Sequence, residues 1–171
     1  PALSPAAALS LARIGIQVDP ALDAWLAREM LDGLAGCDKR GETQALRILT
    51  ILREISDGPR MAAWLSNVLR HSNPRIRSKA ALLIGRRREN SRWVEQPKED
   101  TDPRVRANAI EGLWGMQDDG SRNALWDASR DAHNRVAGNA LLGLHRIGDP
   151  RAIQPILAMA AHAEPRFRAT A

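Results

Sequence analysis

The sequence predicts an all-α protein, an α-α superhelix (a solenoid) of about five stacked helical hairpins. Three observations indicate this. The 171 residues are 44% hydrophobic and rich in Ala, Leu and Arg, which favour helix, whereas aromatic residues make up only 4% and Tyr is absent. A short motif recurs at a spacing near 31 residues. Further apolar segments of helical length lie between its copies, so each repeat is a hairpin that buries its faces by stacking on its neighbours.

The repeated motif is a polar residue, then Pro or Asn, then Arg, then an apolar residue. Its four copies are Asn73-Pro74-Arg75-Ile76-Arg77, Asp102-Pro103-Arg104-Val105-Arg106, His133-Asn134-Arg135-Val136-Ala137 and Glu164-Pro165-Arg166-Phe167-Arg168. We number positions from the apolar residue, so position 0 is Ile76, Val105, Val136 and Phe167, at spacings of 29, 31 and 31 residues. Position +4 is Ala in every copy, and position +8 is Ile84, Leu113 and Leu144 in the first three. These positions share one face of a helix with 3.6 residues per turn and therefore predict a buried stripe.

The residues around each motif predict where helices begin and end. Pro at position −2 suits the first turn of a helix, because its missing N–H would have no partner there. Asn73 or Asp102 before it can cap that helix, and Gly148-Asp149-Pro150 ends one helix and starts the next. The second helices of the hairpins are predicted at Pro59–Arg70, Arg122–Arg130 and Arg151–His162, with a shorter segment at Ser91–Pro97 that Pro97 interrupts.

The repeats predict a single solenoid domain over residues 1–171. Residues 72–171 contain the clear repeats, whereas residues 1–71 contain degenerate ones. Within the degenerate part, Glu42–Ile55 has the apolar spacing of an amphipathic helix but lacks the Pro-Arg start. Because the chain starts at Pro1 and stops at Ala171, inside a predicted helix, we expect it to be a fragment of a longer protein.

The charge distribution and the single cysteine narrow the class of protein. The net charge is +5, and all the excess lies in residues 72–171, which hold 17 basic and 12 acidic residues. A basic surface of this kind suits an acidic protein, nucleic acid or anionic lipid. Cys37 has no partner for an internal disulfide. The longest uncharged runs have 12 residues, fewer than the roughly 18 of a membrane span, and no signal peptide is visible, so we expect a cytoplasmic protein.

The motif Asp102-Pro103-Arg104-Val105-Arg106 and the later string Ile147-Gly148-Asp149-Pro150-Arg151-Ala152-Ile153 resemble HEAT repeats. The likeness is closest to the short bacterial type also found in phycobilisome lyases, and it is clear over residues 73–171 and loose over 1–72. It implies a scaffold of a kind that serves many different partners. It also implies that the arginines at position +1 form a structural ladder with acidic groups of the turns. The ladder residues would be Arg77, Arg106 and Arg168, with Asp100 and Asp131 as the candidate acids.

A polar, largely basic stripe lies away from the predicted apolar face. Positions −1, +3 and +10 fall between about 260° and 300° around the helix, whereas the buried stripe lies between about 0° and 80°. The resemblance implies that this polar stripe faces the concave surface of the stack. The predicted partner-binding residues are Arg75, Lys79, Arg86, Arg104, Asn108, Arg135, Asn139 and Arg146, together with Trp114 and His145 at position +9. The alternative is a solvated helix face without a binding role.

The donors of this stripe predict a partner with acidic character, because Arg can bind carboxylate or phosphate in bidentate fashion. We therefore expect a protein or peptide partner and a monomeric chain that needs no cofactor. Nucleic-acid binding through the same stripe is the alternative, since phosphate groups would meet the same donors.

The sequence carries no recognisable catalytic or metal-binding motif. None of the four histidines is followed by Glu, so the chain departs from the HEAT-like metal hydroxylases that act on deoxyhypusine, whose ligands are His-Glu pairs. HExxH, paired Cys ligands and a phosphate-binding Gly loop are missing as well. HEAT-like DNA glycosylases combine a basic cleft, Trp side chains and a catalytic Asp, and this sequence offers the stripe and Trp114 but no motif that assigns the Asp. We therefore expect no catalytic residue and no metal, with a glycosylase as the enzymatic alternative.

Overall fold

The computed structural model describes residues 39–52, 65–85 and 91–171. Every regular element in these ranges is a helix, so the protein is all-α as predicted. The elements are α3 (Lys39–Leu52), α5 (Pro74–Gly85), η1 (Ser91–Val94), η2 (Pro97–Glu99), α6 (Pro103–Glu111), α7 (Asp119–Ala128), α8 (Asn134–Arg146), η3 (Pro150–Ala152), α9 (Ile153–Ala160) and α10 (Pro165–Arg168). Residues 65–68 are also helical and belong to the predicted segment Pro59–Arg70. The expectations that concern Cys37 and Arg86 lie outside the described residues.

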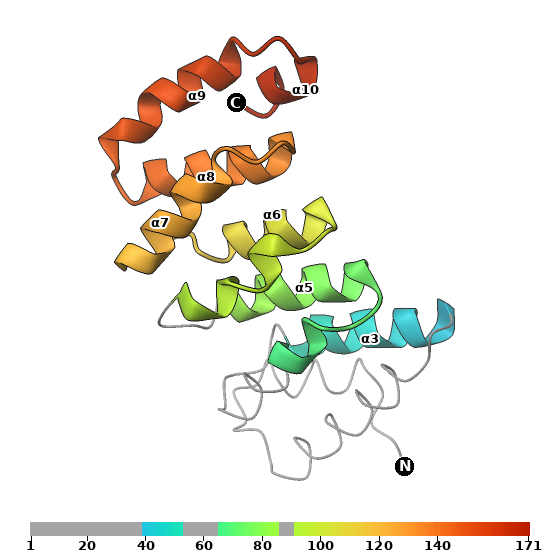
Figure 1. Cartoon of the computed structure of the whole chain (residues 1–171). Helices are drawn as coiled ribbons and strands as arrows, with labels where there is room; N and C mark the ends of the chain where they lie inside the picture. The colour runs from blue at the N-terminus through green and yellow to red at the C-terminus, as the bar shows by residue number, and fades with distance from the viewer. Residues whose placement is uncertain (1–38, 53–64, 86–90) are drawn as a thin grey trace.

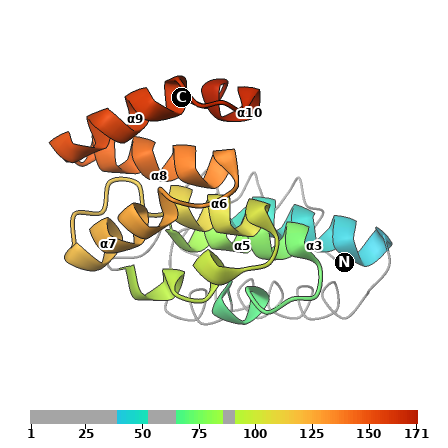
Figure 2. The same ribbon diagram turned by 45° about the horizontal axis from the view of Figure 1, so that its top comes forward.

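The helices stack in chain order. α3 packs against α5, α5 against α6 and α6 against α8, while α10 packs against both α8 and α9. Figure 1 shows α3, α5, α6 and α8 one above the next, with α9 and α10 at the far end of the stack. In the turned view of Figure 2, α3 and α5 lie beside each other, α8 lies above α6, and α9 and α10 lie above α8. α7 with α8, and α9 with α10, are helical hairpins, so the repeats form a stack of hairpins as the sequence predicts.

The predicted apolar stripe forms the core of the stack. Nine residues at positions 0, +4 and +8 of the first three repeats are at most 1% exposed: Ile76, Ala80, Ile84, Val105, Ala109, Leu113, Val136, Ala140 and Leu144. Phe167, at position 0 of the fourth repeat, is 8% exposed. The alanines at position +4 let the neighbouring helix approach closely, because protein interiors are densely packed and a larger side chain would hold the helices apart.

Side-chain caps and a glycine set the helix ends at the predicted places. Asn73 Oδ1 accepts the backbone N–H of Arg75 at 2.9 Å where α5 begins. Asp102 Oδ1 accepts the backbone N–H of Arg104 at 2.8 Å where α6 begins. Gly148 follows α8 with a φ of 77°, a left-handed conformation that Gly adopts without steric cost and that stops the helix. These ends place position −1 of each motif in the first turn of its helix.

Two glycines allow α5 and α6 to touch backbone to backbone. A Cβ added to Gly85 would lie 2.2 Å from the Cα of Gly112. A Cβ added to Gly112 would lie 2.9 Å from the ring of Trp93. No side chain fits between the two backbones at this crossing, so the first two layers of the clear repeats are held at a fixed, close distance.

Two prolines determine where the segments before α6 and α10 change direction or begin a helix. Pro97 interrupts the segment before α6 as predicted, because it has no N–H to donate to the carbonyl four residues earlier, and the segment forms the short 3₁₀ turns η1 and η2 instead of one helix. Pro165 begins α10, which ends after four residues at Arg168. The backbone N–H groups of Ala169 and Ala171 still donate to the carbonyls four residues earlier, at 2.9 and 3.2 Å, so helical hydrogen bonding continues to Ala171.

Candidate functional site

Four exposed arginines lie in the first turns of successive helices. They are Arg75 on α5, Arg104 on α6, Arg135 on α8 and Arg166 on α10, all at position −1, and we call them the arginine row. Their side chains are between 51% and 65% exposed. Because α5, α6 and α8 lie side by side and α10 packs on α8, corresponding positions on these helices repeat from layer to layer (Figure 1).

Each arginine of the row has a carboxylate beside it. Arg75 reaches Glu42 of α3 at 3.2 Å, and Arg104 contacts Asp102 through its Nε and NH2 at 3.1 and 2.9 Å. Hydrogen bonds from Arg104 lower the pKa of Asp102 below its usual range, so this pair remains charged at neutral pH. Exposed ion pairs contribute little free energy in water. A carboxylate from another molecule can therefore compete for these guanidinium groups at small cost.

Arg135 and Arg166, the third and fourth arginines of the row, also have a carboxylate beside them. Arg135 donates to Asn108 Oδ1 at 3.0 Å and lies 4.0 Å from Glu111. Arg166 Nε donates to Glu164 at 2.6 Å. The sequence shows an acid two residues before Arg166, whereas Glu111 reaches Arg135 only because α6 and α8 pack together, and sequence reasoning did not predict that contact.

The two predicted asparagines at position +3 join neighbouring helices instead of offering free donors. Asn108 Nδ2 donates to the Oγ and the backbone O of Ser78 at 2.8 and 3.2 Å. Asn139 Nδ2 donates to the backbone O of Ala107 at 2.9 Å. Each bond crosses from one layer to the layer before it. These amides therefore fix how the helices lie against each other, and with that the geometry of the arginine row.

Trp114 is half-buried just after α6 and rests against α8. Its Nε1–H donates to the backbone O of Asn139 at 2.8 Å, and the guanidinium of Arg146 lies 4.2 Å from the centre of its ring. A Cβ added to Gly143 would lie 2.9 Å from Trp114 Cδ1, so the ring edge rests directly on α8. The ring therefore contacts two other predicted binding residues, the backbone of Asn139 and the guanidinium of Arg146.

The predicted binding residues thus separate into two groups. The arginine row occupies the N-terminal ends of the helices, whereas Trp114, His145 and Arg146 lie near the C-terminal ends of α6 and α8. A hollow of about 550 Å³ opens at these C-terminal ends, and it is lined by Leu82, Gly85, Glu111, Gly112, Trp114, Gly115, Met116 and Arg146. Lys79 is half-buried on α5. It does not belong to the arginine row, and it does not line this hollow.

The arginines at position +1 connect one repeat to the next. Arg77 donates from Nε and NH2 to the two oxygens of Asp100 at 2.7 and 2.9 Å, and from NH1 to the carbonyl of His71 at 2.7 Å. Arg106 pairs with Asp131 at the same two distances. In both cases the acid stands at position −5 of the following repeat. This is the ladder that the family resemblance implied for these four residues.

The ladder acids remain ionised. Burial raises the pKa of Asp100, but the hydrogen bonds from Arg77 and from the backbone N–H of Asp102 lower it more, so the net pKa lies below its usual range. The same balance of burial against the Arg106 hydrogen bonds leaves the pKa of Asp131 lowered. A charge-assisted, bidentate pair of this kind is stronger than a neutral hydrogen bond.

Arg168 occupies the same place in the fourth repeat but has a different environment. Its NH1 donates to the carbonyls of His162 and Ala163, both at 2.7 Å. Among the described residues, no carboxylate reaches its Nε or NH2 within hydrogen-bond distance. Arg168 therefore makes the ladder's hydrogen bonds to the carbonyls of its own turn, but it has no ion pair with an acid among the described residues.

Residues 39–52, 65–85 and 91–171 contain no group of three or more His, Cys, Asp or Glu side chains that could hold a metal ion. No helix in these ranges is long and apolar enough to cross a membrane.

Comparison with known families matches residues 90–171 to HEAT repeats. This region consists of HEAT repeats. A comparison with curated proteins finds no match. HEAT repeats generally mediate protein–protein interaction and are typically non-enzymatic. The match covers α6 to α10, the helices that carry three of the four arginines of the row.

Proposed function

We propose that this protein is a non-catalytic scaffold whose arginine row binds an acidic segment of a partner protein. The observation that carries the proposal is the row itself, one exposed guanidinium in the first turn of each successive helix. Arginine suits this role because its planar fork binds a carboxylate in bidentate fashion. The neighbouring acids hold the guanidinium groups in place until a partner carboxylate replaces them.

The spacing of the layers indicates what the partner segment looks like. Packed helices lie about 10 Å apart, and an extended chain advances about 3.3 Å per residue. An extended peptide with a Glu or Asp at about every third residue would therefore meet one arginine per layer. Because Asn108 and Asn139 fix the helices against each other, the row is pre-organised and loses little entropy on binding.

Nucleic acid is the second candidate, and the net charge of +5 is the observation that favours it. Acidic residues lower the positive electrostatic potential along the row, because each of its four arginines has one beside it: Glu42, Asp102, Glu111 and Glu164. These carboxylates oppose a phosphate backbone and an acidic peptide alike. What favours the peptide is that HEAT repeats generally mediate protein–protein interaction.

A DNA-glycosylase role would need an aspartate that acts as a base. Burial raises the pKa of Asp100, Asp118 and Asp131, but hydrogen bonds lower it more in each case. Side-chain hydrogen bonds from arginines lower the pKa of Asp102 and Asp149. A carboxylate with a lowered pKa is a weak base. These five aspartates therefore support the scaffold and not the enzyme.

The test is the double variant Arg104→Glu with Arg135→Glu, measured by fluorescence anisotropy with a labelled peptide that carries Glu at every third position. We expect binding to be lost while the melting temperature stays unchanged, because both side chains are exposed. The matched control is Arg70→Glu with Arg130→Glu, which makes the same charge change at two exposed turn residues outside the row. Binding that survives in the row variant, or is lost equally in the control, would reject the proposal.

The same titration with single- and double-stranded DNA and RNA decides between the two partners. For duplex DNA, each phosphate contact lowers the logarithm of the binding constant by about 0.9 for every tenfold rise in salt concentration. If nucleic acid binds at about 0.15 M salt and the row variant abolishes it while the peptide does not bind, the partner is nucleic acid. If only the peptide binds at that salt concentration, the partner is a protein.

A further inference from the structure

Among the described residues, Arg135 is the one arginine of the row whose side chain donates to a neutral group. Arg75, Arg104 and Arg166 donate to carboxylate oxygens at 3.2, 2.9 and 2.6 Å. Arg135 instead donates from NH2 to the amide oxygen of Asn108 at 3.0 Å. The four layers of the row are therefore not equivalent for a partner that offers carboxylates.

The residue two positions before the arginine accounts for this difference. Asp102 and Glu164 stand two residues before Arg104 and Arg166 and supply their carboxylates. The corresponding residue of the third repeat is His133, which has no carboxylate. The arginine of that repeat therefore finds its acceptor on the neighbouring helix α6.

Asn108 holds the guanidinium of Arg135 in place without neutralising it. Its Nδ2 donates to the Oγ and the backbone O of Ser78 at 2.8 and 3.2 Å, and Ser78 is buried. The amide cannot turn over without breaking these bonds to a buried partner. Its oxygen therefore stays directed at Arg135, which is oriented before any partner arrives.

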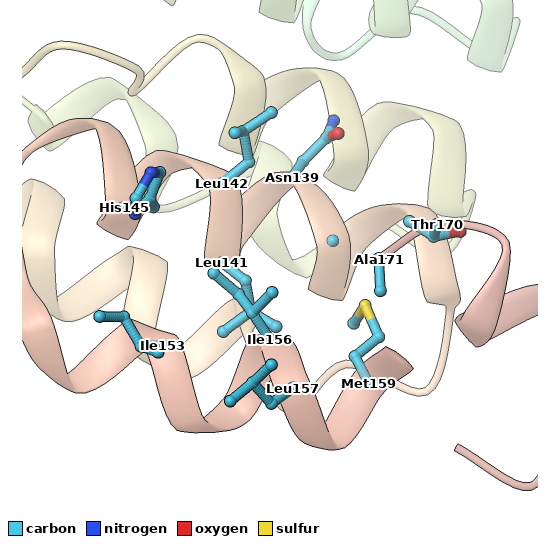
Figure 3. A pocket seen from close by; sticks show the side chains of 11 residues that line it. Asn139, Leu141, Leu142, His145, Ile153, Ile156, Leu157, Met159, Thr170 and Ala171 are labelled. Atoms are coloured by element: carbon cyan, nitrogen blue, oxygen red, sulfur yellow. The ribbon is translucent and has the colours of Figure 1, made fainter. Parts of the chain in front are cut away.

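The equivalent amide one repeat later does not bind an arginine. Asn139 lies on α8, beside a hollow of about 390 Å³ between α8 and α9 (Figure 3). Its Nδ2 donates to the backbone O of Ala107 at 2.9 Å. The arginine of the following helix, Arg166, donates to Glu164 instead. Within the described ranges, the contact of a row arginine with an amide is thus confined to the layer of α6 and α8.

The guanidinium of Arg135 can accept a carboxylate without giving up a charged hydrogen bond. A guanidinium has several N–H groups, and in the described part of the chain a single hydrogen bond uses those of Arg135. Glu111 attracts this group, but its carboxylate lies 4.0 Å from NH2, beyond hydrogen-bond distance. At Arg104, by contrast, an incoming carboxylate must replace Asp102, so one ion pair is exchanged for another.

We propose that Arg135 is the residue of the row that selects the partner, and that the dominant acidic residue of the partner is the one that meets it. A carboxylate at Arg135 adds a charge-assisted, bidentate contact, whereas carboxylates at the other layers replace acids of this chain. The partner is therefore an acidic segment in which one Glu or Asp contributes most of the affinity. The proposal rests on the proposed function, because it concerns the same row, and it assigns unequal weights to the layers.

The first test removes one arginine at a time and uses the labelled peptide with Glu at every third position. We expect Arg135→Gln to weaken binding about tenfold, the size of one charge-assisted contact. Arg130→Gln removes the same charge at an exposed residue outside the row and should change the affinity less than about twofold. The variant Arg104→Gln with Asp102→Asn removes a complete ion pair from the row. It should weaken binding less than about threefold, because no carboxylate is left there without a partner.

The second test gives Arg135 an acid of its own. His133→Asp copies the place of Asp102, so binding should weaken about as much as in Arg135→Gln. The melting temperature should not fall, because Asp is a favoured N-cap residue and His133 makes no side-chain cap. A loss of binding without a loss of stability separates competition by the new acid from local unfolding. Asn123→Asp adds the same charge at an exposed position of α7 and is the matched control.

The third test makes the reciprocal change at Arg104. Asp102→Asn removes the acid while keeping a residue that can cap α6, so the freed guanidinium should bind the peptide about fivefold more tightly. Asp119→Asn makes the same charge change at an exposed residue of α7 and should leave the affinity within about twofold of the native value.

These variants distinguish a failure of the proposal from a failure of the proposed function. Equal losses in Arg135→Gln and in the variant without the pair of Arg104 and Asp102 would overturn the unequal weights, although the row would still bind. Unchanged affinity in His133→Asp would show that an acid of this chain does not compete, which also overturns the proposal. If the peptide does not bind the native chain, or binds the charge-reversed variant Arg104→Glu with Arg135→Glu equally well, the proposed function fails and this proposal fails with it.

Discussion

The layers around α5, α6 and α8 are joined by charged side chains, whereas the last layer, around α8, α9 and α10, is joined by neutral ones. The former layers are linked by Arg77 with Asp100 and by Arg106 with Asp131. In the last layer, Asn134 Nδ2 donates to Thr170 Oγ1 at 2.7 Å and to the backbone O of Arg166 at 3.1 Å. The same repeat can thus be stacked with or without the ladder, so the ladder is not needed for stacking as such.

What the ladder adds is a penalty for misalignment. The side chains of Arg77 and Asp100 are only 14% and 7% exposed, so a shift of one layer past the other would leave two poorly hydrated charges without partners. The neutral contact in the last layer carries no such penalty, because its side chains are uncharged. We infer that the ladder fixes the alignment of the inner layers, while the last layer relies on its apolar contacts.

The largest expected effect comes from filling the glycine contact between the inner layers. Gly85→Ala places a Cβ 2.2 Å from the backbone of Gly112, and backbone cannot move aside as a side chain can. We expect a loss of about 3 kcal/mol or more in the free energy of unfolding, measured by urea denaturation. Gly138→Ala in the last layer is the matched control. Its Cβ comes closest to the methyl group of Thr170, a side chain and not backbone, and Ala favours helix. The loss should therefore be smaller, about 1 kcal/mol, which includes the Oγ1 hydrogen bond that Thr170 gives up when it turns.

If the two alanine variants lose the same stability, the inner and the last layers are equally tightly packed, and the comparison between them fails. A large loss in Gly138→Ala alone would mean that the contact with Thr170 is the rigid one.

Much of this architecture is readable from the sequence, because the repeat shows the same stripe several times. The buried residues at positions 0, +4 and +8 and the caps Asn73 and Asp102 follow from helical periodicity and from local hydrogen bonding alone. The contacts of the candidate site do not. Asn108 and Trp114 occupy polar or edge positions on the helical wheel, and only the packing of a neighbouring helix decides whether they face a partner or that helix.

The last layer has no ladder pair, because position +1 of the third repeat is Ala137 and position −5 of the fourth is His162. This feature is only partly predictable from the sequence. Ala137 and His162 stand out in the alignment of the four repeats. The family resemblance names the ladder residues but not which acid each arginine binds, and the structure shows that position +1 pairs with position −5 of the following repeat. The exposure of Leu142, Ile153 and Leu157 could not be predicted either, since aliphatic residues on a helix are ordinarily assigned to the core.

An effect of intermediate size is expected from pH. The pKa of Asp100 is lowered in the folded chain, so its contribution to stability is present above its unfolded pKa of about 3.9 and is lost as pH falls through the lower, folded pKa. We expect Asp100→Asn to cost about 2 kcal/mol at pH 7, discounted for the partial exposure of Arg77. The difference between native and variant chains should shrink as the pH falls from about 5 to 2. Urea denaturation at several pH values measures both quantities, and a difference that stays constant with pH would show that the charge of Asp100 is not what stabilises the layer.

The smallest expected effect comes from building the missing ladder pair into the last layer, with Ala137→Arg and His162→Asp. Ala137→Arg alone should destabilise the chain, because Ala137 is 1% exposed and the new charge would have no acid partner. His162→Asp alone should change stability little, because Asp can still accept the N–H of Glu164, although the ring contact with Phe167 is lost. In the double variant the two new side chains occupy the places of Arg106 and Asp131. We expect a favourable coupling free energy of about 1 kcal/mol in a double-mutant cycle measured by urea denaturation.

The matched cycle in the inner layers is Arg106→Ala with Asp131→His, which replaces the ladder pair by the residues of the last layer. If the two layers differ only in this pair, both cycles should give coupling of the same sign and similar size. Coupling in the inner cycle but none in the last layer would mean that the backbone around Ala137 and His162 no longer presents the ladder geometry. The neutral contact of Asn134 with Thr170 would then have replaced the ladder structurally and not only in sequence.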